Sequence, residues 1–287
     1  MATDVQSPQV LVAQDRPAPA RGNMLSEVWW VAGRSLRKLT RNPALLFFSL
    51  MMPLIWLVLF SQMFAKLFAQ GAVLGGPQLP YDYVAVMLPG VATMTAIQSA
   101  SQSGFGMVAD IETGFMDKFF VSPIRRSSVL VGKLLADGFR MAVQASLMLL
   151  IAYVFTLVAG WRIPFATGVP GAALLVLMTA SFGVAFSGLS NTVALRTKNT
   201  EATMMVSFTL TFPLLFLSTA MLPKMLLPGW VQNFSSVNPV SYLANASREL
   251  ILTGYDWPDL GRAALAIVIL GAILNGFAVM AFRAQGK

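Results

Sequence analysis

The side chains that most often carry out catalysis are missing from this sequence. It contains no histidine and no cysteine, which excludes Ser-His and Cys-His nucleophilic catalysis, histidine metal sites and histidine proton relays. The nearest match to a phosphate-binding loop is residues 127–134, but this stretch lacks the loop's first glycine and the hydroxyl residue that should follow Lys133. We therefore expect no catalytic residue, no metal site and no cofactor in this chain, and we do not predict an enzyme.

A polar and charged stretch, residues 110–126, lies between two long apolar segments. It combines acids, bases and aromatic rings: Asp110, Glu112, Phe115, Asp117, Lys118, Phe119, Phe120, Arg125 and Arg126. In a helix, Phe115 and Phe119 would share one apolar face, and Pro123 would end the helix. Such an amphipathic element either lies on the lipid surface or docks onto a soluble partner, and the pattern itself leaves both open.

The composition is that of an integral membrane protein. The 287 residues are 56% hydrophobic and only 11% charged, whereas soluble domains have about 25% charged residues. A net charge of +8 is then typical of basic cytoplasmic loops. We expect membrane lipid around the chain and no nucleic-acid partner.

Six apolar segments are long enough to cross a membrane, because about 20 helical residues span its ~30 Å hydrocarbon layer. They are residues 44–64, 83–108, 134–159, 167–192, 202–222 and 262–282. The sequence thus predicts an all-α polytopic membrane protein.

The segments outside these spans have their own patterns. Residues 1–23 contain prolines and charges, which predicts a disordered cytoplasmic tail. Residues 24–41 place apolar and basic residues on opposite helix faces, which predicts a helix in the membrane interface. Residues 240–252 are apolar but too short to span, so we expect re-entrant half-helices between spans five and six.

Lysine and arginine predict the orientation in the membrane. They concentrate in the N-terminal region, residues 110–140, residues 196–198 and the C-terminus. The positive-inside rule places these segments, and therefore both termini, on the cytoplasmic side of the plasma membrane. Near the start of span three, Asp137 and Arg140 have the i,i+3 spacing of a helical ion pair.

The second span is unusually polar, which makes it the best internal candidate for a transport path. Thr95, Gln98, Ser99 and Gln102 lie on its polar side. Polar residues of this kind also join helices within membranes, and the two interpretations have about equal weight. On span five, Phe208 and Phe212 form an aromatic stripe that either packs, faces lipid or lines a path for a large amphiphile.

Together these residues resemble the ABC-2-type permeases, the membrane subunits of ATP-binding-cassette exporters, and most of all the bacterial daunorubicin-resistance type. After span two this family has acids, a glycine, an acid, an aromatic residue or leucine, and Thr/Ser-Pro. The matching residues here are Glu112, Gly114, Asp117, Phe120 and Ser122-Pro123. The stretch Asn238-Pro-Val-Ser-Tyr242 is similar to a second family motif, whereas Asp110-Ile-Glu112 lacks the arginine that the family often has there.

The resemblance implies a complex in which two permeases, identical or related, bind two copies of a separate ATPase that holds ATP and magnesium. Residues 112–122 would form the coupling helix on the ATPase. The contacting residues would be Glu112, Gly114, Phe115, Asp117, Lys118, Phe119, Phe120 and Pro123. The implied function is export of a drug, an antibiotic or a lipid-like amphiphile.

Three alternatives stay open from the sequence. A permease of the same family could export a glycolipid or polysaccharide, although the expected lining has few aromatic-plus-acid pairs suited to sugars. A self-contained carrier or channel would usually place an acid at mid-membrane, and the spans have almost no charge away from their ends. An intramembrane enzyme is disfavoured by the missing histidine and cysteine.

Overall fold

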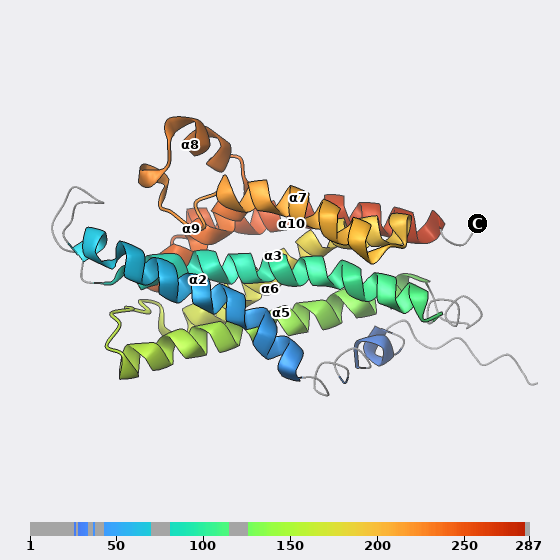
Figure 1. Ribbon diagram of the computed structural model, residues 1–287, viewed down its shortest axis with the longest axis horizontal. Helices are drawn as coiled ribbons and strands as arrows, with labels where there is room; N and C mark the ends of the chain where they lie inside the picture. The colour runs from blue at the N-terminus through green and yellow to red at the C-terminus, as the bar shows by residue number, and fades with distance from the viewer. Residues whose placement is uncertain are drawn as a thin grey trace, which may run out of the picture.

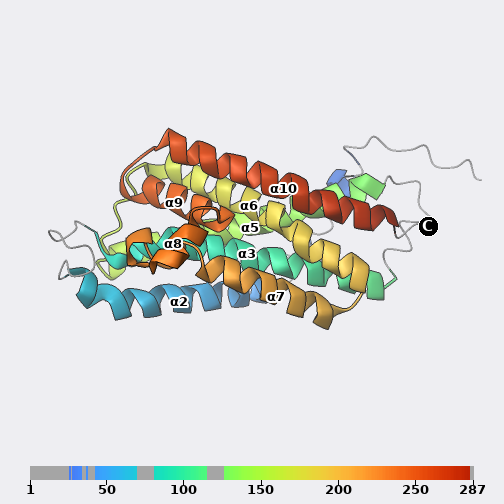
Figure 2. The ribbon, with the colours of Figure 1, turned by 90° about the horizontal axis from the view of Figure 1, so that it is seen from above.

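The computed structural model describes Ser26, residues 28–33, Arg37 and residues 43–69, 81–114 and 126–284. All regular structure in these residues is helical, and the long helices run nearly side by side along one axis (Figures 1 and 2). The elements from residue 43 onward are α2 (Pro43–Ala69), α3 (Tyr83–Glu112), α5 (Arg126–Val158), α6 (Gly168–Thr197), α7 (Thr200–Phe216), η1 (Lys224–Leu226), α8 (Gly229–Ser235), α9 (Pro239–Leu252) and α10 (Trp257–Ala284).

Five of the described helices are long and apolar enough to cross a membrane: α2, α3, α5, α6 and α10. They cover five of the six predicted spans to within one residue at the end of α5 and the start of α6, and most of them extend further at one end or both. The chain is therefore a multi-pass membrane protein. The predicted count of six is not confirmed, because α7 has only 17 residues, about 25 Å of helix.

The early end of α7 has a local cause. The predicted span ran to residue 222, but the helix stops at Phe216, and the Ser218 hydroxyl donates to the Leu215 carbonyl at 2.6 Å. Serine hydroxyls compete in this way with the helical backbone pattern. Pro223 and Pro228 follow, and the chain then forms η1, α8 and α9 rather than one continuous span.

Helix α3 is the centre of the bundle. In its most apolar 18-residue window 94% of the residues are buried, and it packs against α2, α5, α6, α7 and α9. Two glycines permit its closest approaches. A Cβ at Gly90 would lie 1.6 Å from the Ala220 carbonyl oxygen, and one at Gly104 would lie 2.7 Å from the Ser190 carbonyl oxygen.

The described part of the predicted interface helix packs on α5. Val28 and Val31 are buried, whereas Trp29 and Trp30 are 76% and 67% exposed. A Cβ at Gly132 of α5 would lie 2.8 Å from the Val31 Cβ, so the contact is close. The predicted tail, residues 1–23, lies outside the described residues.

Candidate functional site

The predicted coupling segment connects α3 to α5 at one end of the bundle. Helix α3 ends at Glu112, and Gly114 adopts φ 64° with its amide donating to the Ile111 carbonyl at 3.0 Å. This left-handed conformation is one that glycine adopts without strain, so the glycine permits the turn out of the helix. The remaining predicted coupling residues, Phe115, Asp117, Lys118, Phe119, Phe120 and Pro123, lie outside the described residues.

The same end of the bundle holds two other parts of the chain. The turn between α6 and α7 and the end of α10 at Ala284 lie there as well, as Figure 2 shows. Lys198, in this turn, has φ 49° and its amide donates to the Ala194 carbonyl at 2.9 Å. The opposite end carries α8, α9 and the connection from α5 to α6.

A largely buried ion pair within α5 is hydrogen-bonded to α3. Arg140 Nη2 lies 3.2 Å from Asp137 Oδ1, which confirms the pair predicted from their spacing. The same guanidinium donates to the Ser99 carbonyl at 2.9 Å, and the Ser103 hydroxyl donates to the second Asp137 oxygen. Burial strengthens charge-assisted hydrogen bonds, so this pair fixes α5 against α3.

Amide side chains extend this network to two more helices. The Ser103 hydroxyl oxygen also lies 3.2 Å from Asn191 Oδ1 of α6, and Ser99 donates to Gln144 Oε1 of α5. Gln144 Nε2 in turn donates to Ser49 of α2 at 2.6 Å. Sequence reasoning missed Gln144 and Asn191, although each is the only amide side chain in its predicted span.

The predicted path residues divide into two groups. Thr95 and Ser99 are buried, and Thr95 donates to the Val91 carbonyl at 2.9 Å and contacts Met148 Sδ at 3.8 Å. Gln98 and Gln102 are half-buried and form no hydrogen bond with another described residue. The first group thus contributes to packing against α5, and the two glutamines retain free amides.

The predicted aromatic stripe lies on the outside of α7. Phe208 is 49% exposed and Phe212 is 58% exposed, and Phe212 stacks on Phe216 with ring centroids 4.7 Å apart. A single subunit therefore leaves this stripe uncovered. Lipid or a second subunit can contact it.

At the opposite end, Arg248 of α9 joins three parts of the chain. Its guanidinium donates to the carbonyls of Val86 in α3 at 3.0 Å and Thr219 at 2.7 Å, and to Asn245 Oδ1 at 3.0 Å. Tyr83 of α3 donates from its hydroxyl to the Met221 carbonyl at 3.1 Å. The turn after α7 is thereby tied to both helices.

The Asn238–Tyr242 motif forms the start of α9. Asn238 caps the helix by accepting from the Val240 amide at 3.0 Å, and its own amide donates to the Leu214 carbonyl of α7 at 2.6 Å. Pro239 occupies the first turn, where its missing N–H costs nothing. Tyr242 donates to the Ser236 carbonyl at 2.6 Å, which holds α8 above α9.

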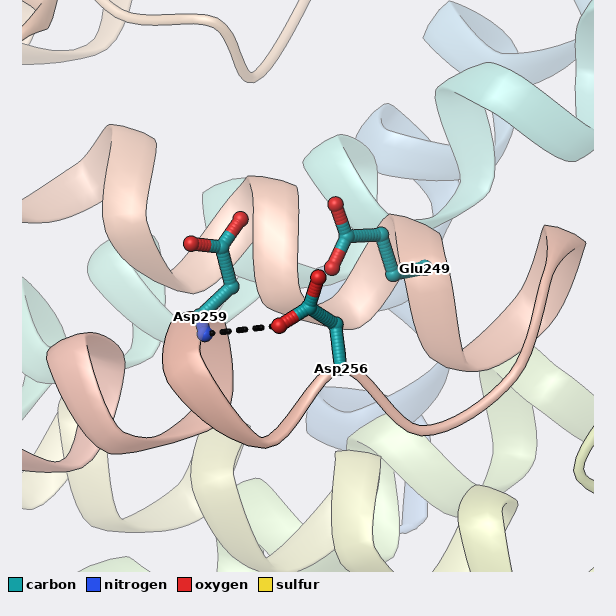
Figure 3. A group of neighbouring side chains, drawn as sticks. All are labelled: Glu249, Asp256 and Asp259. Atoms are coloured by element: carbon teal, nitrogen blue, oxygen red, sulfur yellow. Dashed lines mark hydrogen bonds between the residues drawn. The ribbon is translucent and has the colours of Figure 1, made fainter.

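Three acids gather where α9 meets α10, as Figure 3 shows. A carboxylate oxygen from each of Glu249, Asp256 and Asp259 lies within 4.8 Å of the others. Partial burial, then the charges of Asp259 and Asp256, raise the pKa of Glu249. Asp256 accepts from the Asp259 amide at 3.2 Å, and Asp259 pairs with Arg262 at 2.7 Å. These contacts are those of a capped and charge-paired helix start.

Comparison with known proteins agrees with this arrangement. Residues 26–252 match the ABC-2 type transporter family, so the chain belongs to that family. It is 28% identical over 277 residues to the "Daunorubicin resistance ABC transporter permease protein DrrB1" of Streptomyces coeruleorubidus, a match that covers 96% of this chain and 90% of that relative.

Two further relatives are more distant. The "Probable doxorubicin resistance ABC transporter permease protein DrrC" of Mycobacterium tuberculosis is 27% identical over 58% of each chain. The "Probable multidrug ABC transporter permease YbhR" of Escherichia coli is 21% identical over 70% of this chain and 53% of its own. The resemblance to ABC-2-type permeases of the daunorubicin-resistance type is confirmed.

Proposed function

We propose that this chain is the membrane-spanning subunit of an ATP-driven exporter that moves a hydrophobic or amphiphilic compound, such as a drug, an antibiotic or a lipid-like molecule, across the plasma membrane. The observation that carries the proposal is the match to the daunorubicin-resistance permease over 96% of the chain. The sequence has no phosphate-binding loop, so ATP and magnesium would bind to a separate subunit.

In this proposal two permeases pair with two ATPase subunits. Residues 112–122 would contact the ATPase, with Glu112 and Gly114 at the exit from α3. The end of α3, the turn between α6 and α7 and the end of α10 lie at one end of the bundle, which supports a cytoplasmic face there, because basic residues concentrate in the same segments. Both termini would then be cytoplasmic.

The proposal includes six passes through the membrane. Helix α7 is short, but it runs back along the bundle from its turn with the C-terminal end of α6 toward the end that carries α8, as Figure 2 shows. With α7 counted, the chain would cross six times, and α8 and α9 would form half-helices at the outer end. A transport path would use Gln98 and Gln102, whose amides bond to no other described residue, and the exposed rings Phe208 and Phe212.

Reconstitution into proteoliposomes tests the proposal. The permease would be purified with its ATPase, and movement of daunorubicin would be followed by fluorescence quenching with and without ATP. We expect transport only when both subunits and ATP are present. Transport by the permease alone would favour a self-contained carrier or channel. ATP hydrolysis stimulated by a glycolipid and not by any amphiphilic drug would favour the glycolipid or polysaccharide alternative.

A further inference from the structure

Two hollows meet at the end of the molecule where α8 and α9 lie. The first is a polar pocket of about 180 Å³ between α8, α9 and the start of α10, and its lining includes Lys224 and Asn245. The second is an apolar groove of about 490 Å³ along α10. Tyr242 and Arg262 line both of them, so the groove and the pocket are direct neighbours.

The groove has the length of one membrane leaflet. Its walls on α10 run from Arg262 through Leu265 and Ile269 to Ile273, which is about 16 Å at ~1.5 Å per residue. Half of the hydrocarbon layer is about 15 Å. The side chains of Leu265, Ile269 and Ile273 are all at least half exposed, so the groove is open along the outside of the bundle.

The free polar groups of the pocket are mainly hydrogen-bond donors. Within the described part of the chain, no acid pairs with the Lys224 ammonium. Arg262 uses Nη1 for Asp259 at 2.7 Å, which leaves its other guanidinium nitrogens available. Asn245 uses its oxygen to accept from Thr219 and Arg248, which leaves its amide hydrogens available. A ligand here should therefore be rich in acceptor oxygens, as a phosphate is.

The one acid among the described residues that line the pocket, Asp259, does not cancel the preference for a ligand with acceptor oxygens. Its carboxylate is paired with Arg262. The two acids beside Asp259, Glu249 and Asp256, do not line the pocket. Lys224 therefore adds a positive charge within the pocket lining that no acid of the described residues pairs with. An apolar groove one leaflet long that ends at two cations is complementary to a lipid with a phosphate head group.

We propose that the pocket and groove together bind one membrane phospholipid, with its phosphate at Lys224 and Arg262 and an acyl chain along α10 between Leu265 and Ile273. The lipid would hold η1 and α8 against the membrane-facing side of α10. This inference concerns a bound lipid of the surrounding leaflet and does not depend on the transported compound or on the ATPase.

Native mass spectrometry of the full chain in detergent tests the proposal. The protein is titrated with phosphatidylglycerol and, separately, with a diacylglycerol of the same chains, which lacks the phosphate. We expect one phosphatidylglycerol to remain bound per chain and the diacylglycerol to bind at least about tenfold more weakly, because charge-assisted hydrogen bonds are lost. Equal binding of the two lipids would overturn the role of the cations.

Three variants locate the bound lipid. Lys224→Gln with Arg262→Gln should weaken phosphatidylglycerol binding about tenfold or more. Ala266→Phe fills the groove and should weaken it similarly, whereas Val268→Phe, at an exposed position of α10 outside the groove, should leave it unchanged. Unchanged binding in Ala266→Phe, or equal losses in both phenylalanine variants, would overturn the proposal. Loss of subunit pairing in Ala266→Phe with unchanged lipid binding would assign the groove to a second copy and would also overturn it.

Discussion

Arg248 Nε lies 3.0 Å from the carbonyl oxygen of Val86, so a side chain of α9 is hydrogen-bonded to the backbone of α3. The same guanidinium reaches the Thr219 carbonyl at 2.7 Å, in the turn after α7. Three segments that are distant in the sequence thereby share one cation. A multi-donor group of this kind is characteristic of arginine, because lysine cannot present donors in a fixed fork.

Arg248→Met should destabilise the protein strongly. The methionine preserves apolar bulk but leaves the carbonyls of Val86 and Thr219 without this donor, and an unsatisfied buried polar group costs about 1–3 kcal/mol. We expect a clear fall in the thermal unfolding midpoint in detergent. Arg162→Met is the matched control, because Arg162 forms an exposed pair with Asp82 at 3.0 Å and such pairs contribute at most about 1 kcal/mol. Equal shifts in the two variants would contradict the role of Arg248.

Gly90→Ala should also lower stability. The added Cβ would lie 1.6 Å from the Ala220 carbonyl oxygen, and backbone must move to accommodate it. Overpacking of this kind costs about 1–3 kcal/mol. Gly276→Ala in α10 is the control, because nothing lies within 4 Å of its Cβ position and alanine is the better helix former. The unfolding midpoint should therefore fall for the first variant and rise slightly for the second.

Gln98→Leu combined with Gln102→Leu separates the two interpretations of α3. Since neither amide bonds to another described residue, the double variant should keep its unfolding midpoint and change which compounds are transported. Ser99→Ala removes a buried hydrogen bond to Gln144 and should instead lower stability, with transport of all compounds reduced alike. Transport assays with several amphiphiles and a thermal scan measure both effects. A uniform loss of stability in the glutamine variant would remove the support for a path at these positions.

Phe119→Ala combined with Phe120→Ala tests the coupling segment. Burial of one such ring stabilises a contact by roughly 1.5–3 kcal/mol, so loss of two should weaken ATPase binding at least about a hundredfold. Copurification of the ATPase measures this loss, while insertion of the permease should be normal. Phe234→Ala is the control, because Phe234 is exposed on α8 at the other end of the bundle.

A charge reversal in the same segment gives a second readout. Asp117→Lys should weaken ATPase binding, and the size of the effect should change with salt because exposed charges are screened. If the ATPase copurifies at the normal level with both coupling variants, residues 112–122 do not dock it, and the aromatic rings are better explained as contacts with the lipid surface.

Local sequence patterns predicted those features of the structure that depend on residues close together along one helix. The Asp137–Arg140 pair is confirmed because i,i+3 spacing alone brings the two charges together on a helix. Five apolar segments predicted to be spans are long helices in the structure, because the length and composition of a segment are sufficient to predict such a helix. The ABC-2 family was also predicted from short motifs and is confirmed by the match over residues 26–252.

The missed features depend on contacts between segments far apart in the chain. The role of Arg248, which lies within the predicted half-helix 240–252, was not predicted, because its acceptors are backbone carbonyls in α3 and after α7, which carry no sequence signal. The fifth span was too long because Ser218 ends α7 through a hydroxyl-to-carbonyl bond that hydropathy does not detect. The half-buried state of Gln98 and Gln102 depends on how neighbouring helices pack, so periodicity could not separate them from Thr95 and Ser99.

The continuity of α3 has a mechanical consequence. One unbroken helix joins Gly114, beside the segment proposed to contact the ATPase, to Tyr83 and Val86, which are clamped to the Met221 turn and to α9. Its 30 residues form a strut of about 45 Å. A force applied at Gly114 would therefore displace α9 along with the strut, and the two ends of the molecule would move together rather than independently.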